Sequence, residues 1–382
     1  MIRSNINKLS KWDSFCVLPG HENDINKALI KGCKKIIVQD DKNKLPYIKV
    51  KNTRSFLNNY LKQYDNLLKN IKIIGVMDNN AAYILYSILN SIEMKAAYIG
   101  RKGYYKDEKI QDIYNLEVDD LYEMLLDSYH SYYKYAIIEL DDYLIENDVL
   151  ANIKFDIILV NKIYNNDIKY VDFSMRLLFE KISKNGSIII NGDNAYIGYM
   201  GYKKMITYGF TDNDYKIVKY ILTKNKTMFK YLHNNKYYNI KTDLFGIDNI
   251  YMTLSLIITL SKLKISDRVI NEVFSKISIP YNYEVIPYKD NYIMLHKLDI
   301  NNDIKDFMKN IKLYNYNRIF IITNSNDESI INMLMEYTKY IIISNDKDKI
   351  NVIMKKILKK VENNDLVLFL ETEENIKTES YA

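Results

Sequence analysis

Residues 71–93 read IKIIGVMDNNAAYILYSILNSIE, and this stretch decides the fold class. Its β-branched beginning, residues 71–76, predicts a short buried strand. The apolar residues that follow recur at the three- and four-residue spacing of one helical face: Ile84, Leu85, Ile88, Leu89 and Ile92. A strand, a short connection and a helix in this order begin a parallel α/β unit.

The same alternation continues along the chain. Near-continuous apolar runs predict further buried strands at 97–99, 135–139, 155–160 and 187–191, with helical patterns between them such as 173–184. The C-terminal part shows a shorter alternation of the same kind. It predicts strands at 318–323, 340–344 and 366–370 and helices at 328–337 and 349–361. We therefore predict the α/β class, with a central parallel sheet and a small Rossmann-like block at the end.

The chain has 382 residues, enough for two or three domains. We predict an N-terminal domain at 1–70, with a helix near 22–31 and strands near 35–38 and 47–50. A central domain follows at 71–279 and a C-terminal domain at 280–382. Pro280 and Pro287 bracket a non-helical stretch at the second boundary.

Composition excludes several classes of protein. The longest dense apolar stretch, 251–260, is about half the roughly 20 residues that a bilayer crossing needs, so no membrane span is expected. No secretory signal is visible, and the two cysteines, Cys16 and Cys33, suit a reducing cytoplasm. The net charge of +6 is not gathered into a basic block, which disfavours nucleic acid as a partner.

The junction between the first strand and its helix is the natural place for a phosphate. A Walker-type loop needs glycines, a lysine and a serine or threonine, but only Gly75 is present, and Ala82 and Tyr83 stand at the last two positions. Asp78 would also face an incoming triphosphate. At about 4 Å and an effective dielectric near 20, one such like-charge contact costs roughly 4 kcal/mol. We therefore do not expect this loop to hold ATP in the usual way.

Residues 73–100 nevertheless resemble the ATP-loop region of the Mur ligases, the ATP-dependent amino-acid-adding enzymes of peptidoglycan synthesis. The family loop reads Gly-Val-Thr-Gly-Thr-Asn-Gly-Lys-Thr-Thr, and Gly75, Val76 and Asn80 match it. Partial matches run in order over about residues 15–350, closest to the UDP-N-acetylmuramoyl-tripeptide synthetase type. The resemblance implies a three-domain architecture with a shortened UDP-binding-like N-terminal domain, an ATPase-like central domain and a Rossmann-like C-terminal domain.

The resemblance also implies roles for single residues. Gly75, Asp78, Asn80, Ala82 and Tyr83 would form a vestigial phosphate loop, Asn249 would lie on the adenine side, and Glu139 would be the magnesium-binding carboxylate. With Asp141 and Asp142, Glu139 equally suits a solvated acidic loop. The lysine that is carbamylated in family enzymes falls near Ser174 or Met175, where no lysine stands. No catalytic residue is assigned.

Two functional hypotheses remain open. The first is a catalytically inactive Mur-ligase-like protein, a pseudoenzyme with a binding or scaffold role in cell-wall metabolism and no expected cofactor. Its partner would be a UDP-muramoyl peptide or a cell-wall synthesis protein. The alternative is a divergent but active ATP-dependent C–N ligase that uses ATP and Mg²⁺ to add an amino acid to a UDP-muramoyl peptide. That enzyme would need a phosphate site rebuilt from Lys95, Lys102 or Lys162.

Overall fold

The structure is a computed structural model in which residues 1–39, 47–161, 163, 168–194, 205–223, 226–244, 246–276, 284–288, 291–298, 304–344 and 346–372 are described. The chain divides into two compact units, Met1–Tyr208 and Gly209–Ala382, which are considered separately below. The predicted domain boundaries at 70 and 279 stay a prediction, and the second of them, with Pro280, lies outside the described residues.

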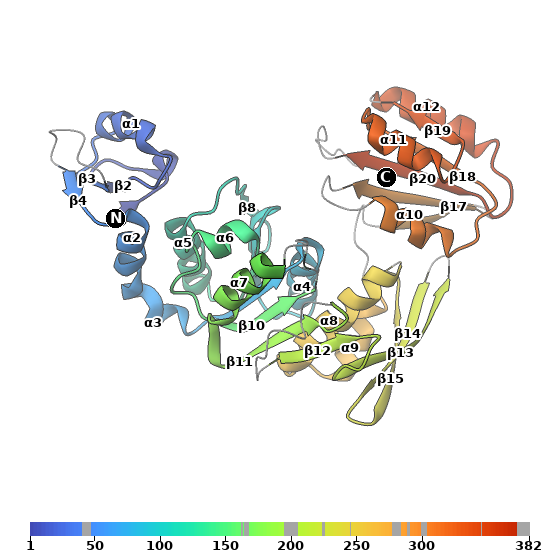
Figure 1. The fold of residues 1–382 in the computed structure, drawn as a ribbon, viewed down its shortest axis with the longest axis horizontal. Helices are drawn as coiled ribbons and strands as arrows, with labels where there is room; N and C mark the ends of the chain where they lie inside the picture. Colours follow the sequence, from blue (N-terminus) through green and yellow to red (C-terminus); the bar gives the residue numbers. More distant parts are fainter. Residues whose placement is uncertain are drawn as a thin grey trace. The chain divides into compact units, whose positions relative to one another are not determined.

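The first unit begins with a small parallel sheet of order β1-β2-β3-β4 (Figure 1). Its elements are β1 (Ile2–Arg3), β2 (Ser14–Cys16), α1 (Ile25–Ile30), β3 (Lys35–Val38) and β4 (Tyr47–Lys49). Two helices, α2 (Thr53–Leu61) and α3 (Asp65–Leu68), lead to the central sheet. Phe15, Ala28 and Ile36 pack into a core cluster under α1, which explains why these short strands hold together.

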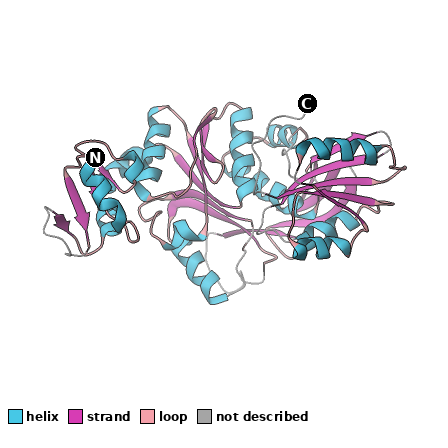
Figure 2. Cartoon of the chain, turned by 90° about the horizontal axis from the view of Figure 1, so that it is seen from above, coloured by secondary structure: helices cyan, strands magenta, loops and turns pink. Residues whose placement is uncertain are grey.

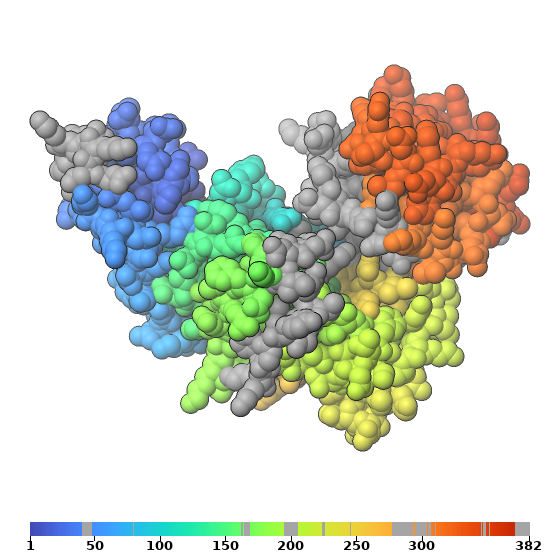
Figure 3. Space-filling view, viewed as in Figure 1, coloured from blue at the N-terminus to red at the C-terminus, as the bar shows by residue number. Residues whose placement is uncertain are grey.

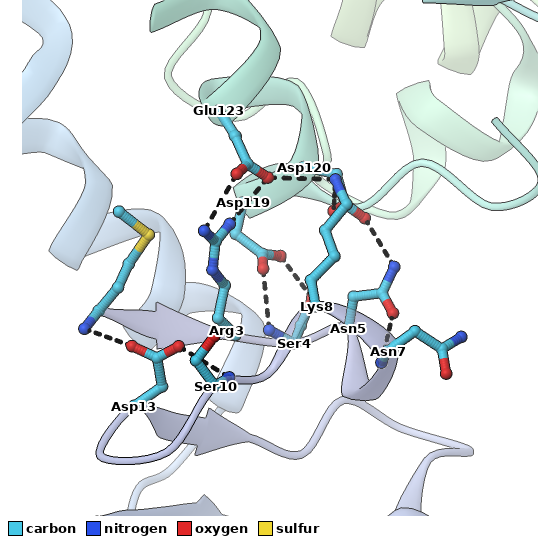
Figure 4. A network of polar contacts seen from close by, with 11 residues as sticks. Arg3, Ser4, Asn5, Asn7, Lys8, Ser10, Asp13, Asp119, Asp120 and Glu123 are labelled. Atoms are coloured by element: carbon cyan, nitrogen blue, oxygen red, sulfur yellow. Dashed lines mark hydrogen bonds and ion pairs between the residues drawn. The ribbon is translucent and has the colours of Figure 1, made fainter. Parts of the chain in front are cut away.

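A polar network joins the N-terminal segment to helix α5 (Val118–His130) (Figure 4). The backbone N–H of Ser4 donates to the carboxylate of Asp119 at 2.9 Å, and the Ser4 hydroxyl donates to its other oxygen. Beside this pair, Arg3 forms two hydrogen bonds to Glu123, and Lys8 lies 2.8 Å from Asp120. Asp119 and Asp120 are each only 3% exposed, so this part of the network is buried, whereas the side chain of Glu123 is 39% exposed.

The central sheet of this unit runs in the order β12-β11-β10-β5-β9-β6-β7-β8. Its strands are β5 (Lys72–Met77), β6 (Ala96–Gly100), β7 (Gly103–Tyr105), β8 (Lys109–Gln111), β9 (Tyr135–Glu139), β10 (Phe155–Val160), β11 (Ile182–Asn191) and β12 (Met205–Gly209). Pairing is parallel from β12 to β6 and antiparallel for β7 and β8. Helices α4 (Asn79–Ser91), α5, α6 (Asp142–Glu146) and α7 (Ile168–Phe179) alternate with the strands along the chain. Figure 2 shows the helices of the chain in cyan and its strands in magenta. The predicted α/β class is confirmed.

One predicted element is wrong in its bounds. We expected a helix over 173–184, but α7 ends at Phe179 and residues 182–184 already belong to β11. The backbone N–H of Phe155 donates to the carbonyl of Lys181 at 2.9 Å, and Phe155 pairs with Ile182. Pairing with β10 thus overrides the local helical periodicity.

The second unit begins with two antiparallel hairpin connections that the sequence analysis did not predict, joining β13 (Tyr215–Thr223), β14 (Lys226–His233) and β15 (Lys236–Thr242). The strand signal exists in β14, where alternate residues Thr227, Phe229 and Tyr231 are buried. Asn234 and Asn235 connect β14 to β15 with φ of 48° and 60°. Two consecutive positive φ angles are what a two-residue hairpin turn requires, and asparagine tolerates them.

Two helices, α8 (Ile247–Lys262) and α9 (Asp267–Phe274), follow. The rest of the unit is a sheet of order β16-β17-β20-β18-β19, parallel except for the β16–β17 pair, and it confirms the predicted C-terminal block. Its elements are β16 (Glu284–Tyr288), β17 (Asn291–Leu298), α10 (Ile304–Lys312), β18 (Ile319–Thr323), α11 (Glu328–Met335), β19 (Tyr340–Ile343), α12 (Lys347–Leu358) and β20 (Leu366–Thr372). Throughout the described part of the chain, no helix has the length and hydropathy that a bilayer crossing demands.

Candidate functional site

The β5–α4 junction is the site that the sequence singles out. Strand β5 ends at Met77 and α4 begins at Asn79, so Asp78 alone connects them. Asp78 is extended, and its Oδ1 accepts a hydrogen bond from the backbone N–H of Ala81 at 2.9 Å. This carboxylate caps the positive end of the helix dipole, which is the place that a bound phosphate takes in nucleotide-binding folds.

The second oxygen of Asp78 is held as well. The Asn161 side-chain amide donates to Asp78 Oδ2 at 2.6 Å, and the Tyr208 hydroxyl donates to Asn161 Oδ1 at 2.6 Å. Asn161 follows β10 and Tyr208 lies near the end of β12, so the chain of hydrogen bonds runs along the carboxyl edge of the sheet. Sequence reasoning missed both partners, although Asn161 directly follows a predicted strand. Lys162, its neighbour, lies outside the described residues.

Gly75, which matches the glycine of the family loop, has a packing role. Gly75 lies within β5, and a Cβ at this position would meet Leu140 Cδ1 at 2.8 Å and Phe155 Cε1 at 2.9 Å. Only glycine therefore lets these two side chains pack against the strand. Ala82 is fully buried, and Asn80 is half-buried in the first turn of α4. Neither position offers the cation that a triphosphate needs.

Tyr83, at the position of the family's serine or threonine, belongs to an aromatic cluster. Its ring centroid lies 5.4 Å from that of Tyr98, 5.5 Å from that of Tyr86 and 5.6 Å from that of Tyr105. The ammonium of Lys102 lies 4.3 Å from the centroid of the Tyr83 ring, a cation–π distance. Burial, with a smaller contribution from Tyr105, raises the pKa of Tyr83. The tyrosine is thus committed to packing.

Glu139, the predicted magnesium ligand, ends β9 and is 4% exposed. Its Oε2 accepts hydrogen bonds from the Tyr98 hydroxyl and from the backbone N–H of Arg101 at 3.1 Å, and its Oε1 lies 3.4 Å from Arg101 Nε. Burial raises the pKa of Glu139, and the Tyr98 and Arg101 contacts oppose this rise. Nearby Asp141 caps α6 by accepting from the backbone N–H of Leu144 at 2.9 Å.

The protein ligands of a nucleotide-bound magnesium ion would have to come from the surroundings of Glu139. Among the described residues, no three His, Cys, Asp or Glu side chains gather into a possible metal site. Both oxygens of Glu139 are engaged by donors, and no serine or threonine stands at position 83 to complete the coordination. Ser174 and Met175, near which the resemblance would place the carbamylated lysine, are each 1% exposed within α7.

The remaining predicted residues lie elsewhere. Asn249 is in the first turn of α8 in the second unit and is 4% exposed. Of the lysines considered for a rebuilt phosphate site, Lys95 lies 6.0 Å from the centroid of the Tyr133 ring, and Lys102 faces Tyr83. The structure therefore brings together Asp78, Asn161 and Tyr208 in one group, and Tyr83, Tyr98 and Glu139 in another.

Replacing Tyr98 with phenylalanine is expected to lower the free energy of unfolding by about 2 kcal/mol, because a buried carboxylate loses a charge-assisted donor. The pKa of Glu139 is already raised, and the substitution raises it further. The substitution thus removes stabilisation from the ionised form of Glu139. The loss of stability therefore grows as the pH rises through the titration of Glu139. Urea unfolding at several pH values measures this effect.

The matched control is Tyr105→Phe, since the Tyr105 ring lies in the same cluster, 5.9 Å from the Tyr98 ring. Its cost is expected to stay within about 0.5 kcal/mol at every pH. Equal losses for the two variants would show that the Tyr98 hydroxyl contributes nothing specific to Glu139.

Comparison with known proteins identifies the family of the middle part of the chain. Residues 80–260 match the family model of the Mur ligase middle domain. Residues 80–260 therefore belong to the family of Mur ligase middle domains. No curated protein matches the sequence.

Solved structures show the shared fold over nearly the whole chain. A UDP-N-acetylmuramoyl-L-alanyl-D-glutamate–2,6-diaminopimelate ligase matches with a TM-score of 0.76 at 15% identity, over 97% of this chain and 88% of that one. A UDP-N-acetylmuramoylalanyl-D-glutamyl-2,6-diaminopimelate–D-alanyl-D-alanyl ligase from Acinetobacter baumannii gives 0.66 at 11% identity, over 97% and 89%. The folylpolyglutamate synthase of Thermotoga maritima gives 0.58 at 12% identity, over 82% and 89%.

Proposed function

We propose that this chain is a Mur-ligase-like protein that does not perform ATP-dependent ligation and acts in cell-wall metabolism as a binding or scaffold protein. The observation that carries this proposal is the carboxylate of Asp78 on the N-terminus of α4. Its two oxygens accept from Ala81 and from Asn161, so the positive end of the helix already holds an anion supplied by the chain itself.

Electrostatics supports the proposal. A triphosphate at this helix end would lie beside the Asp78 carboxylate, and at about 4 Å and an effective dielectric near 20 each such contact costs roughly 4 kcal/mol. The compensating lysine is absent, since Ala82 is buried at its position. An acyl-phosphate intermediate also needs groups that stabilise developing negative charge, and Glu139 is instead enclosed by Tyr98 and Arg101.

The relationship to the Mur ligases suggests a class of ligand. Two of the structures that share the fold are named as ligases of UDP-N-acetylmuramoyl peptides. The partner that this relationship suggests for the present chain is a UDP-muramoyl peptide, or a cell-wall synthesis protein that recognises the same fold. Neither role requires ATP or Mg²⁺ as a cofactor. A cytoplasmic location likewise stays a prediction.

Calorimetric titration with ATP and Mg²⁺ tests the proposal. The wild-type chain is expected to bind with a Kd no tighter than about 1 mM, equivalent to roughly −4 kcal/mol. Asp78→Asn removes the repulsion and is expected to bind nucleotide more tightly than wild type. Asp141→Asn is the matched control, because Asp141 caps α6 with the same geometry but does not occupy the phosphate position.

Micromolar binding of ATP by the wild-type chain would contradict the proposal. Phosphate release that depends on both a UDP-muramoyl peptide and an amino acid would then support the alternative, a divergent active C–N ligase. If Asp78→Asn and Asp141→Asn changed nucleotide affinity equally, Asp78 would have no special part in excluding the anion.

A further inference from the structure

The amino edge of the N-terminal sheet carries an unusual set of exposed side chains. Because β1, β2 and β3 are parallel, the loops that precede β2 and β3 lie at the same edge. The backbone confirms this, since Trp12 N–H donates to the Gly32 carbonyl at 3.1 Å and Lys34 N–H donates to the Asp13 carbonyl at 2.6 Å. We call this edge the N-edge surface, defined by Lys11, Trp12, Ile30, Lys31, Lys34 and Lys35.

Two large apolar side chains project from the N-edge surface. Trp12 is 70% exposed and Ile30 is 86% exposed. Trp12 also has a φ of 77°, in the left-handed region that bulky residues seldom adopt. The backbone adopts this conformation at a cost, and the indole remains in solvent although burial would favour it. Figure 3 shows the N-terminal residues, in dark blue, on the molecular surface.

Positive charge surrounds these two side chains. Lys11, Lys31, Lys34 and Lys35 are all exposed. Within the described part of the chain, none of the four forms a salt bridge; the Lys31 ammonium donates to the neutral carbonyl of Ile6 at 2.8 Å. Asp13 is the acid in these loops, and its carboxylate accepts from the backbone N–H of Ser10 at 3.1 Å. Four lysines against one aspartate leave the N-edge surface with a net positive charge.

The carboxyl edge of the same sheet packs against other elements of the unit. Ser4, which follows β1, is bound to Asp119 of α5, and Thr53 at the start of α2 donates to Gln39 after β3 at 3.2 Å. The carboxyl edge is also where open α/β sheets bind their ligands. The N-edge surface is therefore separate both from the packing within the unit and from the candidate site at β5–α4.

We propose that the N-edge surface docks the chain onto membranes that contain anionic phospholipid, with Trp12 and Ile30 inserted among the headgroups and the four lysines against lipid phosphates. Tryptophan and lysine are the side chains that the membrane interface favours, since each combines an apolar body with a polar end. Charge complementarity selects the anionic lipid, and two protruding side chains give shallow, reversible attachment rather than a span.

The chain itself contains the probe, because Trp12 is its single tryptophan. Vesicles of phosphatidylglycerol and phosphatidylcholine are expected to shift the Trp12 emission to the blue, and lipids with brominated acyl chains to quench it. Phosphatidylcholine vesicles alone are expected to leave the emission unchanged. High salt should reverse the shift, since surface charges are screened.

Matched variants distinguish binding through the N-edge surface from binding that depends only on the net charge of the chain. Changing Lys11, Lys31, Lys34 and Lys35 to glutamine is expected to weaken vesicle partitioning about fivefold for each lysine removed. The same change at four exposed lysines elsewhere in the unit, Lys51, Lys62, Lys69 and Lys154, is expected to have little effect. Ile30→Asp is expected to weaken co-sedimentation on the order of tenfold, whereas Ile110→Asp, at an exposed position in β8, should not.

Two results would overturn the proposal. One is a Trp12 emission that does not respond to anionic vesicles at low salt, which is also the result expected if an acidic protein were the true partner. The other is an equal loss of partitioning in the two sets of lysine variants. Circular dichroism of each variant shows that the fold is retained, and the outcome is independent of whether the chain binds ATP.

Discussion

Ala82→Lys, which places a lysine where the resemblance aligns the family's phosphate-loop lysine, is expected to destabilise the protein by about 3 kcal/mol or more and not to create nucleotide binding. Ala82 is fully buried at the end of the first turn of α4. A lysine there must either bury its ammonium group or displace its neighbours, and both are costly. Asp78 would remain on the helix end, so the repulsion of a triphosphate would persist. Urea unfolding and calorimetry with ATP measure the two effects.

Ser91→Lys provides the control, because it places the same residue at an exposed position on the same helix. A lysine in the last turn is also favoured by the helix dipole, so its cost is expected to be within about 0.5 kcal/mol. A stable Ala82→Lys protein that binds ATP would show that the phosphate site is intact apart from its lysine, and the proposal of an inactive protein would fail.

Stability is expected to depend on pH through Asp119. Burial, with the charge of the adjacent Asp120, raises the pKa of Asp119 to about 6, against the opposing effect of its hydrogen bonds from Ser4. Between about pH 4 and pH 6 the folded chain keeps a proton that the unfolded chain has released. The free energy of unfolding therefore falls as the pH rises through this window, by about 1.4 kcal/mol per pH unit and about 3 kcal/mol in all.

Asp119→Asn is expected to remove this contribution, which is read as the difference between the unfolding free energies of wild type and variant over the window. The other charged groups around the network, Arg3, Lys8, Asp120 and Glu123, stay in place in both proteins. Asp112→Asn, at a side chain 57% exposed, serves as the control and should keep the wild-type profile. Parallel wild-type and Asp119→Asn profiles would contradict the assignment.

The part of the candidate site that is formed by neighbouring residues, at the junction of β5 and α4, was predictable from the sequence. A strand that ends before an aspartate and a helix that starts after it place Asp78 at the helix end, where the sequence analysis expected it to face an incoming triphosphate. The structure added that Asp78 caps α4 through the backbone N–H of Ala81. Most strands of the sheet were also predictable, because their apolar runs are short and continuous. The helix expected over 173–184 was wrong because pairing of Phe155 with Ile182 extends β11 through residues whose own pattern is helical.

The sequence by itself determined the α/β fold and the absence of a lysine at position 82 and of a hydroxyl group from serine or threonine at position 83, since both are written within a few neighbouring residues. Only the tertiary structure decided which side chains contact Asp78 and Glu139. Asn161 reaches Asp78 across 83 residues of chain and Tyr98 reaches Glu139 across 41, so no local spacing encodes either contact. A parallel sheet gathers the carboxyl ends of distant strands at one edge, and the partners met there are set by strand order and register.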